Sequence, residues 1–177
     1  MNFKIYTIIA ALALPMAASA QNTERKLCDF ESADAYRSIK VYDTWENSPF
    51  RNNAIPANIQ VVDNHLDAAD PVRGFAPNPS RHILAVQRSR FGSNTFGALV
   101  GLKEPFAQTK TVQYVHVKIY SPKGGPAMLI GLGNRDDRPH QSPLTEQFWS
   151  TASQPLVANH WNDAVFAVSG ANGVTIH

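Results

Sequence analysis

Residues 111–132 read TVQYVHVKIYSPKGGPAMLIGL, and this stretch decides the class of fold. Within its first half, apolar side chains alternate with aromatic, basic and histidine side chains. A period of two is typical of a β-strand that has one face in a core. The apolar face has Val115, Val117 and Ile119, and the opposite face has Tyr114, His116, Lys118 and Tyr120.

The run SPKGGP at residues 121–126 ends this strand. Two prolines and two adjacent glycines favour a turn and are excluded from the middle of a strand ladder. An apolar segment, Met128–Leu132, resumes directly afterwards. We therefore expect the two strands to form a hairpin with a short loop.

Short β-like stretches recur along the rest of the chain, separated by Gly, Pro and Asn. They are residues 27–31, 39–42, 59–62, 83–87, 96–102, 146–151 and 163–168. After residue 20, no segment of ten or more residues has a helical period, and residues 32–36 are expected to make one turn. This spacing predicts an all-β fold, an antiparallel β-sandwich of jelly-roll type. Val174 and Ile176 look like the start of a last strand that is either truncated or a weakly held edge.

Residues 1–20 have the features of a signal peptide: Lys4, an apolar run over residues 5–16, and the small residues Ala18-Ser19-Ala20. The apolar run is too short to span a bilayer. We expect the protein to be exported, to the periplasm, the cell surface or the medium, without membrane insertion. Residues 21–177 are long enough for one sandwich domain with its own core.

Charge and cysteine content limit the kinds of partner and of covalent cross-link that the protein can have. Without residues 1–20 the chain has 15 basic and 14 acidic side chains. Nucleic-acid binding calls for a basic surface, so this near-neutrality argues against a nucleic-acid partner. Cys28 is the sole cysteine, which excludes an intrachain disulfide, and we expect it to be buried in the first strand.

Several short motifs occur in a familiar order. They are Asp29-Phe30-Glu31, Asn78-Pro79-Ser80, Phe96-Gly97-Ala98, Glu104-Pro105, the strand end at 118–122, and Trp161 ahead of the apolar residues 165–168. This ordered set resembles the jelly-roll, galactose-binding-like modules of exported glycan-processing proteins in gut and marine bacteria, which are similar to carbohydrate-binding modules. Residues 43–51 and 146–149 lie outside the general pattern and indicate a narrower subfamily of unassigned role. The resemblance implies a non-catalytic domain that works beside carbohydrate-active enzymes or other envelope proteins, on a polysaccharide or oligosaccharide.

Sugar recognition needs flat aromatic surfaces flanked by polar groups that reach the hydroxyls. The predicted binding residues are Tyr114, His116, Lys118, Tyr120 and Trp149, with Arg88 and Arg90 at the rim because guanidinium groups suit sulfate or carboxylate. An ordinary solvent-exposed sheet face is the commoner explanation of such a row. Trp149 would serve as a stacking platform only if it, and not Phe148, points outward.

Modules of the resembled type often hold a structural calcium ion. Carried over by that resemblance, Glu31 and Asp163 are its candidate oxygen ligands. The six histidines show no paired spacing that would indicate a transition-metal site.

Two other functions stay open. A small jelly-roll polysaccharide lyase would use His116 and Tyr120 as acid and base, with Arg88 or Arg90 on the uronate carboxylate. A structural or interaction domain of the cell envelope would have no sugar site. The chain has no nucleophile elbow, P-loop or dinucleotide fingerprint, so a catalytic role is the minority interpretation.

Overall fold

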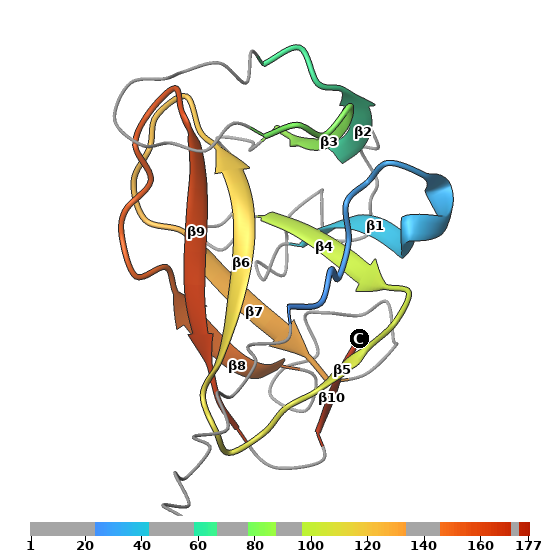
Figure 1. Ribbon diagram of the computed structural model, residues 1–177, viewed down its shortest axis with the longest axis vertical. Helices are drawn as coiled ribbons and strands as arrows, with labels where there is room; N and C mark the ends of the chain where they lie inside the picture. The colour runs from blue at the N-terminus through green and yellow to red at the C-terminus, as the bar shows by residue number, and fades with distance from the viewer. Residues whose placement is uncertain (1–23, 43–58, 67–77, 88–96, 134–145, 171–173) are drawn as a thin grey trace, which may run out of the picture.

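The structure is a computed structural model that describes residues 24–42, 59–66, 78–87, 97–133, 146–170 and 174–177 (Figure 1). The predicted signal peptide, Arg88 and Arg90 lie outside these ranges. No helix among the described residues is long and apolar enough to cross a membrane.

The regular secondary structure of the described residues is almost entirely strand. They are β1 (Tyr36–Tyr42), β2 (Ile59–Asp63), β3 (His82–Val86), β4 (Gly97–Leu102), β5 (Phe106–Ala107), β6 (Gln113–Tyr120), β7 (Met128–Leu132), β8 (Glu146–Thr151), β9 (Trp161–Val168) and β10 (Thr175–Ile176), after one 3₁₀ turn, η1 (Ala33–Ala35). The predicted turn at residues 32–36 and most predicted strands are confirmed to within two residues. The two-residue strand β5 was missed because it is too short to show a period.

All strand pairs in the described residues are antiparallel: β1 with β4, β2 with β3, β5 with β10, β6 with β9, and β7 with β8. The β2–β3 pair is nested in sequence between β1 and β4, and β7–β8 is nested between β6 and β9. Figure 1 shows β6 and β9 running alongside each other in front of β7, with β8 near their lower ends. The sheets pack against one another, which confirms the predicted all-β sandwich.

The hydrophobic core lies between the β6–β9 and β7–β8 pairs. Its buried centre is Ala164, Phe166 and Val168 on alternate positions of β9. Packed against this centre are Val115, Val117, Ile119, Ala127, Leu129, Phe148, Ala152 and Leu156. The apolar face of β6 that the sequence predicted is therefore the face that meets the core.

The predicted hairpin between β6 and β7 is wrong. β6 pairs along its whole length with β9, and β7 pairs with β8. Both apolar faces turn toward the same core, so the chain crosses from one sheet to the other between them. The crossing segment is fixed by Gly124 and Gly125, whose φ angles of 65° and 97° suit glycine, and by an isolated bridge from Gly125 to Leu156. A Cβ at Gly124 would also lie 2.5 Å from the Leu156 carbonyl oxygen.

The first predicted strand, residues 27–31, is also wrong. The Asp29 carboxylate accepts the Glu31 backbone N–H at 3.0 Å, and Phe30 has a φ of 60°. A local side-chain hydrogen bond of this kind competes with strand pairing, and it turns the chain here. Cys28 is accordingly half-buried outside any strand, and burial raises the pKa of its thiol.

The last residues connect separate parts of the sandwich. β10 pairs with β5, Ile176 is buried, and the His177 backbone accepts from Leu102 N–H and donates to Leu132 O. This segment is therefore held on both sides, at the ends of β4 and β7. A truncation after it stays a prediction.

Replacing Phe166 by alanine tests the placement of the core. Phe166 is 1% exposed, and its removal leaves a cavity between the two sheets. We expect Phe166→Ala to lower the free energy of unfolding by about 3–5 kcal/mol, measured by urea denaturation. Ala167→Ser, on the exposed side of the same strand, is the control and should change it by less than about 0.5 kcal/mol. Similar losses in both variants would contradict this core.

Candidate functional site

The outward side of the β6–β9 sheet carries the predicted binding row. Because β6 alternates, its apolar side chains enter the core, and Tyr114, His116 and Lys118 are left exposed on the other side. Tyr114 is the most exposed of the large hydrophobic residues among those described, at 66%. The structure thus brings three of the five predicted row residues together on one rigid strand.

Asp163 of β9 completes this surface. Its Oδ2 lies 2.9 Å from His116 Nδ1, and its Oδ1 lies 4.0 Å from Lys118 Nζ. The register places Asp163 directly opposite Lys118, so the contact with His116 is diagonal. A carboxylate and two potential cations therefore form one polar group on this face of the sheet. We call Tyr114, His116, Lys118 and Asp163 the outward cluster.

Sequence reasoning missed this role of Asp163, which it had assigned only to calcium. Finding it requires the register between two strands that lie more than forty residues apart, and no local signal contains that register.

Tyr120 differs from the rest of the row. It is half-buried, and its ring meets Trp161 of β9 in an edge-on arrangement with centroids 5.7 Å apart. Trp161 is buried, although the register puts it on the outward side with Tyr120. Tyr120 therefore anchors one end of the row and presents less ring surface than Tyr114.

Trp149 lies on the other sheet. It is 46% exposed on β8, and its neighbour Phe148 packs into the core, which confirms that only one of the pair points outward. Ile130 stands opposite Trp149 in the register, and Met128 shares this side of the β7–β8 pair. Trp149 therefore belongs to the β7–β8 pair and the outward cluster to the β6–β9 pair, although β8 also meets β9 where Ser150 Oγ donates to the Ala167 carbonyl oxygen. The predicted site is therefore divided between two surfaces.

The two candidate calcium ligands have separate neighbours. Glu31 Oε1 accepts the Arg81 backbone N–H at 2.7 Å, and Glu31 Oε2 lies 3.3 Å from His82 Nδ1. Asp163 faces His116 and Lys118 instead. In the ranges that the structure describes, no group of three or more His, Cys, Asp and Glu residues could hold a metal ion. Within the described ranges Glu31 and Asp163 are not part of such a group, and the calcium site stays a prediction.

Glu31 instead ties the N-terminal segment to the β2–β3 pair. His82 Nε2 reaches Asp63 Oδ1 at 3.4 Å, so the imidazole stands between two carboxylates. Glu31 contacts Nδ1 and Asp63 contacts Nε2 of the ring, so the imidazole separates the two carboxylates and they cannot ligate one metal ion together. Desolvation disfavours ionised Glu31, but hydrogen bonds from the Arg81 backbone and from His82 outweigh it and hold the pKa below its ordinary value.

A lyase site would need His116 and Tyr120 to converge on one groove. They lie on the same strand, but Asp163 holds His116 and the Tyr120 ring packs on Trp161. The arginines that would bind the uronate lie outside the described residues. The described residues thus supply a base, His116, without a converging acid.

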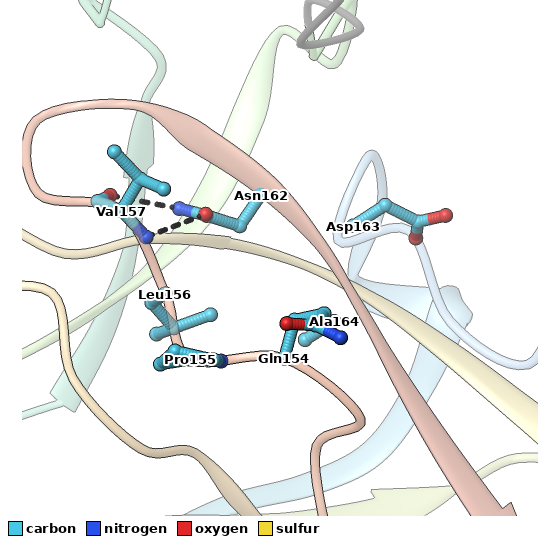
Figure 2. Close-up of a pocket in the computed structure, with 7 residues that line it drawn as sticks. All are labelled: Gln154, Pro155, Leu156, Val157, Asn162, Asp163 and Ala164. Atoms are coloured by element: carbon cyan, nitrogen blue, oxygen red, sulfur yellow. Dashed lines mark hydrogen bonds between the residues drawn. The ribbon is translucent and has the colours of Figure 1, made fainter.

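A hollow of about 170 Å³ lies beside β9, lined by residues 154–157 and 162–164. In Figure 2, the Asn162 amide points to the Val157 backbone and the Asp163 carboxylate points away from the hollow. Asn162 is buried: its Oδ1 accepts Val157 N–H, and its Nδ2 donates to the carbonyls of Ile119, Val157 and His160. The hollow is the gap that this hydrogen-bonded loop leaves against the strand edge, and Asp163 is the one member of the outward cluster among its lining residues.

Comparison of the chain with protein-family models, with curated proteins and with solved structures found no match.

The Glu31 contacts predict a specific acid sensitivity. Since the folded-state pKa is lowered, the ionised carboxylate adds stability that is complete above the ordinary value near 4.5 and is lost as the pH falls through the lowered value. Thermal unfolding of wild type and Glu31→Gln should therefore differ most above the ordinary pKa near 4.5 and converge once the pH falls below the lowered pKa of the folded state. Glu104→Gln, at an exposed glutamate after β4, is the matched control and should follow wild type throughout. A Glu31→Gln difference that persists in acid would contradict the assigned contacts.

Replacing Asn162 by alanine tests the loop. The substitution leaves the Val157 N–H and several carbonyl groups without their partner, and we expect a loss of about 2–3 kcal/mol in urea denaturation. Limited proteolysis should then cut within residues 154–160. Gln154→Ala, an exposed change in the same loop, should leave both measurements unchanged, and equal effects in the two variants would rule out a special role of the Asn162 amide.

Proposed function

We propose that the protein is an exported, non-catalytic carbohydrate-binding module with a jelly-roll, galactose-binding-like sandwich, and that it works on extracellular or periplasmic glycans. One observation carries the proposal: the outward cluster on the β6–β9 sheet. It combines an aromatic residue that is 66% exposed with a paired imidazole, carboxylate and ammonium group on one face of the sheet.

The chemistry of the cluster suits a sugar. A pyranose ring has an apolar C–H face that packs on an aromatic side chain and an edge of hydroxyl groups that need both donors and acceptors. Tyr114 offers the first surface, and His116, Lys118 and Asp163 offer the second. These side chains project from paired strands whose inner faces are in the core, so the surface is rigid before a ligand arrives.

The fold leaves this face without an evident structural role. Exposed ion pairs contribute little to folding stability, so the cluster adds little to what the core already provides. A large aromatic ring in water is likewise not favourable for the fold. Both features agree with a surface that binds a partner.

Binding experiments with Tyr114→Ala test the proposal. A panel of neutral, sulfated and uronate-rich polysaccharides, screened by affinity gel electrophoresis with and without calcium, should give retention by at least one class. Loss of the stacked ring should weaken that retention about fivefold to tenfold while circular dichroism and unfolding stay as in wild type. Because Trp149 lies on the other sheet, Trp149→Ala is the control and should bind like wild type.

Three outcomes would count against this function or this face. A well-folded protein that no polysaccharide retains would favour an interaction domain of the cell envelope. Release of products that absorb in the ultraviolet, as unsaturated sugars do, would indicate a lyase. Retention that Trp149→Ala abolishes and Tyr114→Ala leaves intact would move the site to the β7–β8 sheet.

A further inference from the structure

The outward side of β9 carries two apolar residues beside the outward cluster. Val165 stands opposite His116 in the register, and Ala167 stands opposite Tyr114. Ala167 is exposed, Val165 is partly exposed, and neither belongs to the buried core, whereas Phe166 between them is 1% exposed. The side of an antiparallel sheet that faces water is usually polar. Packing of the core therefore does not account for the apolar character of these two positions.

The register also places Val165 in the middle of this surface. His116 contacts Asp163, which lies two positions along β9 from Val165, the register partner of His116. The close diagonal in this ladder therefore runs in that direction, and the same offset makes Val165 the diagonal neighbour of Tyr114. The valine side chain thus lies between the exposed tyrosine and the carboxylate of the cluster.

The polar end of the cluster does not select a sugar by its charge. Lys118 Nζ lies 4.0 Å from Asp163 Oδ1, too far for a hydrogen bond, so the contacts of the described residues leave the three N–H donors of the ammonium group unused. Hydroxyl, carboxylate and sulfate oxygens all accept a hydrogen bond from an ammonium group. Asp163 Oδ1 accepts one from a hydroxyl group. Because both groups suit the hydroxyl edge of any sugar, the selectivity of this surface comes from its apolar positions.

We propose, on the basis of the function proposed above, that this surface prefers sugars that carry a methyl group and that Val165 determines the preference. Such sugars are the 6-deoxyhexoses and the N-acetylated hexosamines. The sugar ring packs on Tyr114, and its hydroxyl groups bind Lys118 and Asp163. Because adjacent strands lie about 4.8 Å apart, a ring on β6 also covers β9, and the methyl group packs on Val165 and Ala167. A hydroxyl group at that position would lose hydrogen bonds to water without replacing them.

The test compares free sugars in pairs that differ at one substituent. L-Fucose and L-galactose differ by a methyl against a hydroxymethyl group, and so do L-rhamnose and L-mannose. N-Acetyl-D-glucosamine has an acetamido group where D-glucose has a hydroxyl group. Affinities are measured by nitrogen-15 chemical-shift titration of the purified protein. In at least one pair the methyl-bearing sugar should bind about fourfold more tightly, the factor for burying one methyl group, and the amide signals that move should belong to β6 and β9.

Val165→Thr is the variant that isolates the apolar contact. It replaces one methyl group of the valine by a hydroxyl group and keeps a branched side chain that suits a strand. The preference should fall below about twofold, while the affinity for the sugar without the methyl group stays as in wild type. Val86→Thr is the matched control, because Val86 is a 41% exposed strand valine on the β2–β3 pair, and it should keep the wild-type preference. Circular dichroism should show both variants folded.

The remaining outcomes separate this inference from the function beneath it. Equal affinity for both members of every pair would overturn the preference and leave the carbohydrate-binding function standing. A preference that Val165→Thr keeps, or that Val86→Thr abolishes, would overturn the role of Val165. Binding of none of these sugars by a protein that a polysaccharide retains would overturn the inference alone, whereas binding of no sugar and no polysaccharide would overturn the function as well.

Discussion

The antiparallel register between β6 and β9 is the constraint on which the rest of the structure depends. Because side chains alternate across a strand, a slip of one residue would send every core side chain of a strand to solvent. Phe166 and Val168, each 1% exposed, cannot accept such a slip. The same register sets Asp163 beside His116 and Lys118 on the opposite face. The burial of the inner face therefore determines the geometry of the outer one.

The fold class could be predicted from the sequence because its signal is local. The alternation of Val115, Val117 and Ile119 and the placement of glycine and proline between strands are visible in short windows. Short windows do not predict which strands pair, since pairing is decided by which apolar faces can share a core. β6 and β7 look like a hairpin in sequence, but both turn their apolar faces to Phe166 and so belong to different sheets.

The site was predictable only in part for the same reason. Residues two apart on one strand point to the same face, which is why Tyr114, His116 and Lys118 could be grouped from the sequence. Trp149 was grouped with them although its strand pairs with β7 and not with β6 or β9, and the contact of Asp163 with His116 was not foreseen. Both points concern the relation between strands, which composition and spacing do not encode. The Asp29 to Glu31 turn is an error of another kind, where a side-chain hydrogen bond overrode a β-like local sequence.

Stability and the proposed recognition involve different residues in this molecule. Side chains of the inner face, the Asn162 amide and the His177 backbone join the strands and loops, and all of them lie in the interior or at strand ends. The outward cluster contacts water, and its ion pairs are screened and contribute little to folding. A change at Tyr114 or His116 can therefore alter binding without unfolding the sandwich, whereas the register that aligns these side chains is maintained from the other side of the sheet. The outward cluster is thus positioned by residues that no ligand on that face would touch.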